Sequence, residues 1–214
     1  IIWDNVYYIN YSKMVMNVKQ YLGDLNGGGL LIIESRTVAE IQLKKLSEKE
    51  WKQLIVDENV LQKKSAQTAL RFANVIRKRL EVMGKPFNQL LLDVSERAYI
   101  QLLMAAFMIQ SPVIVDFMQE CLAEARRTYK PDITSDAWIN FIDDRIKVIP
   151  ELASYSETTL KRMGSHVIKA LVDAGYLKST RQRQIQAVYL LPEVKDLLIN
   201  INKQELIDVM ECTQ

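Results

Sequence analysis

The sequence predicts a mainly α-helical protein: an N-terminal helix-turn-helix domain (residues 1–86), then a helical C-terminal domain (87–214) that ends in a winged helix with a short β-hairpin (about 133–200). Three observations predict this fold class. Apolar residues recur at spacings of three and four in most long segments, glycine and proline are few (7 and 5), and one late stretch changes to short β-prone segments. With 214 residues and 49% hydrophobic content, the chain is long enough to bury a core in each domain.

The first predicted helix spans about 30–46 and follows the turn Asn26-Gly27-Gly28-Gly29. This glycine run lacks the lysine and Ser/Thr of a phosphate-binding P-loop, so we interpret it as a structural turn. A second helix should start at Ser47, whose Ser-x-x-Glu spacing has the form of a capping box, and run to about Glu58. Ser65 should cap a third helix over 66–83, stopped by Gly-Lys-Pro at 84–86. Three short helices joined by tight turns, with the third one basic, predict a helix-turn-helix unit.

The middle of the chain predicts core helices at about 87–92, 96–109 and 113–129, with Ser95 capping the second of them. Further helices are expected over about 136–148, where Ser135 can cap, and from Ser154 or Ser156 to residue 174. The stretches 176–179 and 185–191 flank a polar loop and predict a hairpin. A last short helix opens at Pro192. Two helices followed by a hairpin with a basic tip are typical of a winged helix.

Composition excludes several classes of protein. The chain has two cysteines and the single histidine His166, which excludes a disulfide framework and a Cys/His metal cage and fits a reducing cytoplasmic compartment. The longest apolar run, 102–109, is far shorter than the roughly 20 residues of a spanning helix, so no membrane segment is expected. No targeting signal is expected either.

The formal net charge is only +2, but the positive charge is concentrated in two stretches. Residues 61–85 hold seven basic side chains against one acidic, and residues 161–183 hold six against one. The remaining residues together carry nine net negative charges. Both basic stretches contain the last helix of a predicted unit, which is the charge distribution expected of a nucleic-acid-binding protein.

Each basic helix is predicted to expose a row of polar and basic residues opposite its apolar stripe. Arg71 and Arg162 are the best candidates for base contact, and hydroxyl and amine groups near each helix N-terminus are candidates for phosphate contact. The candidate DNA-binding residues are Lys63, Lys64, Ser65, Gln67, Thr68, Arg71, Asn74 and Lys78 in the first stretch, and Ser156, Thr158, Thr159, Lys161, Arg162, Ser165 and Lys169 in the second. Arg181 and Arg183 are added at the wing tip.

An enzyme is not expected. Asp143-Asp144 is the only acidic pair near an apolar helix, and adjacent helical residues point about 100° apart, so the two carboxylates are no preset metal pair. We expect no cofactor and no small-molecule substrate. His166 flanks the second exposed row and is expected to be a surface or boundary residue rather than a metal ligand.

The chain resembles the BrxA proteins of BREX phage-defence systems from about residue 25 to 198. The motifs that carry the resemblance lie at 27–31, 34–36, 39–40, 59–65, 68–69, 76–80, 156–162, 174–177 and 188–194. The resemblance implies a small, non-enzymatic cytoplasmic component, encoded beside a methyltransferase and other BREX proteins, whose helix-turn-helix and winged-helix parts bind double-stranded DNA.

Three alternatives stay open at this point. The basic rows could instead face acidic surfaces of other BREX proteins in a scaffold. A basic helical bundle can also grip RNA by its backbone. Finally, a preferred DNA sequence would indicate a transcriptional regulator.

Overall fold

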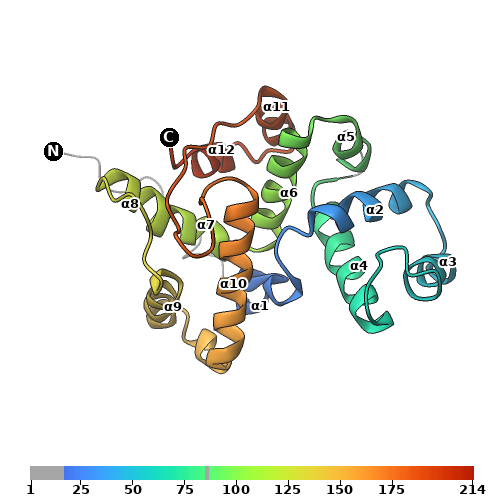
Figure 1. Cartoon of the computed structure of the whole chain (residues 1–214), viewed down its shortest axis with the longest axis horizontal. Coiled ribbons are helices and arrows are strands. Elements are labelled where there is room, and N and C mark those ends of the chain that lie inside the picture. The colour runs from blue at the N-terminus through green and yellow to red at the C-terminus, as the bar shows by residue number, and fades with distance from the viewer. Residues whose placement is uncertain (1–16, 85–86) are drawn as a thin grey trace.

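The computed structural model describes residues 17–84 and 87–214, and these residues are mostly helical (Figure 1). In chain order the elements are α1 (Val18–Leu22), η1 (Leu25–Gly27), α2 (Ile32–Leu43), α3 (Glu48–Lys52), η2 (Gln53–Asp57), α4 (Ala66–Glu81), α5 (Phe87–Asp93), α6 (Glu96–Gln110), α7 (Val113–Phe117), η3 (Met118–Ala123), α8 (Glu124–Arg127), α9 (Ala137–Val148), η4 (Pro150–Ser154), α10 (Glu157–Asp173), α11 (Pro192–Asn200) and α12 (Glu205–Met210). The mainly α prediction is confirmed. The sequence pattern predicts no helix at α1 or α12.

Side-chain caps explain where several helices begin. The hydroxyls of Ser47, Ser65, Ser95 and Ser156 each accept a hydrogen bond from a backbone N–H in the first turn of the helix that follows. Ser47 and Glu50 form the complete capping box that the sequence predicts. Ser135 is the exception, because α9 begins at Ala137 without a side-chain cap.

The core is centred on α6, whose residues from Gln101 to Met108 are all buried. Helices α2, α4 and α5 pack together beside it, and α4 also contacts α6 directly (Figure 1). Phe117, Trp138 and Phe141 pack as an aromatic cluster that joins α7 to α9, with ring centroids 5.3 to 5.7 Å apart. Buried apolar side chains from both halves of the chain form one cluster. The division into domains at residue 86 stays a prediction, and Lys85 and Pro86 lie outside the described residues.

The predicted β-hairpin, and with it the winged helix, is wrong. The described residues contain no β-strand, only two isolated bridges, Asp132 with Gln184 and Leu177 with Ile185. The polar loop is closed by a few backbone hydrogen bonds, such as Lys178 N–H to Gln184 C=O at 2.9 Å, and Arg183 has a left-handed φ of 50° that interrupts extension.

In the rest of the predicted second strand, backbone N–H groups donate hydrogen bonds to side chains instead of to a partner strand. The backbone N–H groups of Val188, Leu190 and Leu191 donate to the side chains of Thr213, Glu211 and Gln101. The β-prone residues of this segment therefore form an extended connection that is tied to α6 and the C-terminal tail, and no ladder forms.

Within the described part of the chain, no single helix has the length and apolar composition needed to cross a membrane. Only a bent pair, α6 with the helical stretch 113–127, passes that test jointly, and its two halves meet at 109°.

Candidate nucleic-acid interface

Helix α4 buries one face and exposes the predicted row. Ala69, Ala73, Ile76 and Leu80 are buried, which fixes the orientation of the helix against α2 and α6. On the opposite side Gln67, Arg71, Asn74 and Lys78 are all exposed. The Arg71 guanidinium lies 5.3 Å from the ring centroid of Phe72. The structure thus brings the predicted row together, while its binding role stays a prediction.

Other cations of this stretch have partners within the protein. Lys63 pairs with Glu34, and its backbone N–H and C=O are both hydrogen-bonded to the side-chain amide of Asn59. Arg77 pairs with Glu48 at 2.7 Å and with Glu81 at 3.1 Å. Arg79 is only 4% exposed. Lys64, in contrast, is exposed. The excess of positive charge counted along the sequence is therefore larger than the positive charge that α4 presents to solvent.

Helix α10 has the same organisation. Met163, Val167 and Leu171 are buried, whereas Thr158, Arg162, Ser165 and Lys169 are exposed as the sequence predicts. Two cations on this helix have a carboxylate four residues away. Lys161 lies 2.5 Å from Glu157, and Lys169 pairs with Asp173. The hydrogen bond that Lys161 donates lowers the pKa of the Glu157 carboxyl below its ordinary value.

The two helices begin with the same local structure. Ser65 donates to the Thr68 hydroxyl at 2.9 Å and accepts from its N–H at 3.2 Å, and Ser156 and Thr159 do the same at the same distances. Two hydroxyls predicted to contact phosphate, those of Ser65 and Ser156, thus act as helix caps, and the hydroxyls of Thr68 and Thr159 accept hydrogen bonds from them. Backbone N–H groups at a helix N-terminus favour anions, although the first turn of α10 also carries the exposed carboxylate of Glu157.

The two arginines predicted at the tip of the loop after α10 lie in different environments. Arg181 is exposed. Arg183 instead donates to the carbonyl oxygens of Thr134 and Ser135, at 2.8 and 2.7 Å, and ties the loop to the segment before α9. Arg183 is thus a structural contact in this conformation, whereas Arg181 is free to point outward.

One residue on this surface was missed by sequence analysis. Asn26, in the glycine turn between α1 and α2, is exposed and accepts a hydrogen bond from Arg162 at 3.2 Å. The sequence identifies the turn but does not show that it lies against α10. His166 occupies the boundary position that was expected, since it is half-buried with Nδ1 2.6 Å from the Leu25 carbonyl oxygen.

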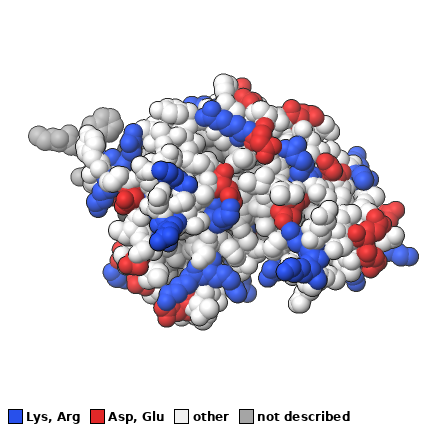
Figure 2. Space-filling model, viewed as in Figure 1, with Lys and Arg blue, Asp and Glu red and all other residues white. Residues whose placement is uncertain are grey.

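Lys and Arg side chains gather along α10 and in front of α4 on the face shown in Figure 2. Figure 1 shows that both helices start at the same lower edge of this view and run upward. Red carboxylates are interspersed, consistent with the ion pairs described above. Basic side chains near both helices are thus visible on one face of the molecule.

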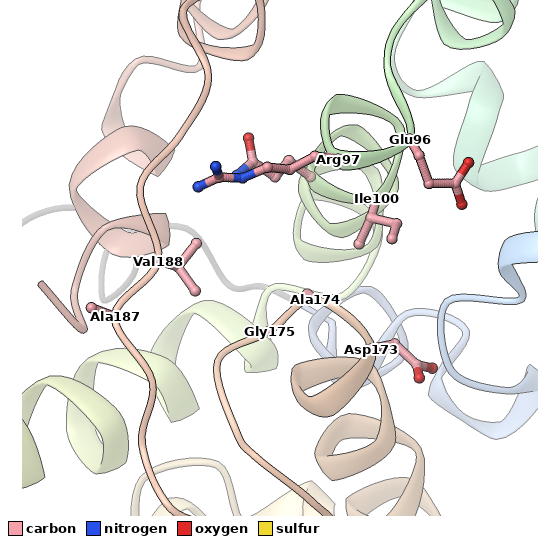
Figure 3. A pocket seen from close by; sticks show the side chains of 9 residues that line it. Glu96, Arg97, Ile100, Asp173, Ala174, Gly175, Ala187 and Val188 are labelled. Atoms are coloured by element: carbon pink, nitrogen blue, oxygen red, sulfur yellow. The ribbon is translucent and has the colours of Figure 1, made fainter.

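A separate open cleft of about 450 Å³ lies between the start of α6 and the end of α10. Ile100, Ala174 and Val188 supply apolar walls, and Arg97 reaches across it from α6 and donates to the Tyr189 carbonyl at 3.1 Å (Figure 3). The carboxylates at its rim are already paired, Glu96 with Arg36 and Asp173 with Lys169.

Over residues 17–84 and 87–214, no group of three or more His, Cys, Asp or Glu side chains could hold a metal ion. Asp143 and Asp144 are both exposed, and Asp144 pairs with Lys147 at 2.6 Å.

Comparison with known proteins places most of the chain in one family. The BrxA family model matches residues 19–202. BREX protein BrxA of Escherichia coli O9:H4 (strain HS) is 41% identical over 199 residues, which cover 93% of each protein. BREX protein BrxA of Paramagnetospirillum magneticum (strain ATCC 700264 / AMB-1) is 30% identical and covers 91% of this chain and 96% of its own length.

A crystal structure of an uncharacterized protein from Magnetospirillum magneticum superimposes with a TM-score of 0.81 at 27% identity, covering 90% of this chain and 99% of that one. The fold is therefore also that of a solved structure. On the family match and on both relatives, the chain belongs to the BrxA family of BREX proteins.

Proposed function

We propose that this protein is a non-enzymatic component of a BREX phage-defence system that binds double-stranded DNA. The observation that carries the proposal is the likeness of α4 and α10, two helices with the same N-terminal caps, each of which exposes a polar and basic row. Arginine, lysine and asparagine side chains are those that contact phosphates and base edges when a helix enters a major groove.

Most of the binding free energy should come from the phosphate backbone. Lys64 and Lys78 contribute point charges, while Arg71 and Arg162 carry the planar donors suited to bidentate contact with a base or a phosphate. Within the described chain, no carboxylate pairs with any of these four cations. They are therefore available to a polyanion without first breaking an ion pair.

The direct test is fluorescence anisotropy with a random-sequence duplex of about 30 base pairs at several salt concentrations. We expect the logarithm of the affinity to fall linearly with the logarithm of salt, with a slope of about −0.9 for each phosphate neutralised. Absence of binding at low salt would contradict the proposal. An excess of unlabelled duplex RNA in the same assay distinguishes a DNA-binding protein from an RNA-binding one.

A charge-reversal variant locates the interface. Arg71→Glu with Arg162→Glu should abolish binding and leave the fold intact, because both side chains are exposed. The matched control is Arg126→Glu with Arg127→Glu, which makes the same charge change at exposed positions of α8. Equal losses in the two double variants would indicate a nonspecific effect of net charge.

A scaffold role, with other BREX proteins as partners, is one of the alternatives. Co-purification with them that survives nuclease treatment, together with no affinity for free duplex, would replace DNA binding by this role.

A further inference from the structure

The segment Asp24–Gly29 lies between the two basic helices and touches both. A Cβ added at Gly27 would overlap the Val75 side chain of α4. One added at Gly29 would lie 3.4 Å from the backbone oxygen of His166 on α10. Since Gly27 and Gly29 are two residues apart, their Cα atoms are separated by about 7 Å at most. Where they contact this segment, helices α4 and α10 are thus separated by little more than the width of a single backbone segment.

Buried polar contacts fix this segment in place. The Arg79 guanidinium, on α4, donates to both carboxylate oxygens of Asp24 at 2.9 to 3.1 Å and to the carbonyl oxygens of Gly28 and Gly29. It also stacks 4.1 Å from the ring centroid of Phe107 on α6. From the other side His166 contacts the Leu25 carbonyl at 2.6 Å, where Nδ1 must donate. The relative position of α4 and α10 is therefore set by one buried, hydrogen-bonded junction.

Asn26 is the exposed residue at the middle of this junction. Its Oδ1 accepts from Arg162 Nη2 at 3.2 Å, and in the described residues its side-chain N–H groups donate to no protein acceptor. An arginine side chain is long and loses rotamer freedom when it binds. A partner that already holds the guanidinium reduces that loss and directs the remaining donors outward.

We propose that α4, the Asp24–Gly29 segment and α10 form one continuous surface that holds a single DNA duplex, with Asn26 as the positioning residue for Arg162. The inference rests on the proposed function and adds a binding mode to it. The major groove alone is about 12 Å wide, so two helices separated by one strand of backbone are too close to engage two duplexes independently.

The first test is the number of duplexes bound per chain, measured by native mass spectrometry with an excess of a duplex of about 14 base pairs, just over one helical turn. One duplex per chain is expected for the unaltered protein. Two duplexes per chain would overturn this inference and leave DNA binding established. Failure of the unaltered protein to bind any duplex at low salt would overturn the proposed function and the inference together.

The second test is a double-mutant cycle on duplex affinity. Asn26→Ala should weaken binding about 3- to 10-fold, the value of one positioned hydrogen bond, in the unaltered protein and in an Arg71→Ala background. In an Arg162→Ala background it should have no effect, because the side chain that it positions is gone. An equal loss in all three backgrounds, or no loss in any, would overturn the positioning role.

A merely structural role for Asn26 predicts a different result. It would lower the unfolding midpoint and weaken binding equally in every background. We expect the unfolding midpoint of Asn26→Ala to match that of the unaltered protein, since the side chain is exposed and the junction beneath it is held by Asp24 and Arg79.

Discussion

The two basic helices use their positive charge in different ways. On α4 the cations divide by depth, so that Arg79 is buried and structural while Arg71 and Lys78 are exposed. On α10 the cations are all exposed, but Lys161 and Lys169 each pair with a carboxylate one turn away. The positive charge of α4 is thus reduced by the burial of Arg79, and that of α10 by local neutralisation.

This difference shows that charge counted along a sequence is an upper limit on the charge available to a ligand. A buried arginine contributes to stability and nothing to DNA affinity. A surface lysine paired with a carboxylate remains at the interface, and its pair has a net value of at most about 1 kcal/mol. Substitution of the buried cation of α4 should therefore change mainly the free energy of unfolding. Substitution of exposed cations should instead change mainly the affinity for DNA.

The largest effect is expected for Arg79→Ala on α4. It leaves the Asp24 carboxylate, whose side chain is 11% exposed, without its cation, and leaves the Gly28 and Gly29 carbonyls without their donor. Removing one partner of a buried ion pair costs about 3–5 kcal/mol of unfolding free energy. Chemical denaturation followed by circular dichroism measures it.

The control lies on the same helix. Arg71→Ala removes the same charge from an exposed position and should change the unfolding free energy by no more than about 0.5 kcal/mol, while it weakens DNA binding. Equally small changes in unfolding free energy for Arg79→Ala and Arg71→Ala would contradict the structural role given to the buried Arg79.

An intermediate effect is expected for Gly164→Ala on the inner face of α10. A Cβ at this position would overlap the Trp138 ring, which is itself held by a 2.8 Å hydrogen bond to the Leu160 carbonyl. Overpacking costs about 1–3 kcal/mol, although alanine is favoured over glycine in a helix by about 1 kcal/mol. Thermal unfolding should show a lower midpoint for Gly164→Ala.

Ser165→Ala is the matched control for that substitution, because Ser165 is the next residue and is exposed. Its hydroxyl donates only to the Lys161 carbonyl of the same helix. An unchanged or raised midpoint is expected for this variant. A raised midpoint for Gly164→Ala would contradict the prediction and would mean that the Trp138 ring of α9 shifts to make room for the methyl group at little cost in stability.

Local patterns in the sequence predict the helices and their starts well. Ser47, Ser65, Ser95 and Ser156 act as caps because capping depends on residues within three positions of one another. Exposure along α4 and α10 is also a local property, since the apolar stripe of each helix fixes its polar side. The exposed members of both rows are therefore recovered from sequence.

Contacts between distant segments are not recovered. The segment 185–191 is β-prone, yet the N–H groups of Val188 and Leu191 donate to the distant side chains of Thr213 and Gln101, so no hairpin ladder forms. Asn26 meets Arg162 across 136 positions of sequence. Arg79 carries the same charge as Lys78, and only the position of Asp24 in the fold distinguishes their roles. Such pairings are set by tertiary packing, which overrides local propensity.

The smallest effect concerns a neutralised lysine of α10. Glu157→Gln removes the carboxylate that pairs with Lys161 and keeps the residue's size and its position in the first turn. Freed of its partner, Lys161 should strengthen duplex binding about 2- to 5-fold and steepen the salt slope by about 0.9 if it then contacts a phosphate. Glu48→Gln is the control on the α4 side, because the Arg77 that it pairs with also keeps Glu81.

The gain should be the same at pH 6 and at pH 8. The ordinary pKa of a glutamate side chain is 4.5, and the hydrogen bond from Lys161 lowers the pKa of Glu157 below that value. The Glu157 carboxylate is therefore fully ionised at both pH values. Anisotropy titrations at the two pH values check this. A gain that appears at only one of them, or equal gains for Glu157→Gln and Glu48→Gln, would show that overall charge rather than the release of Lys161 controls affinity.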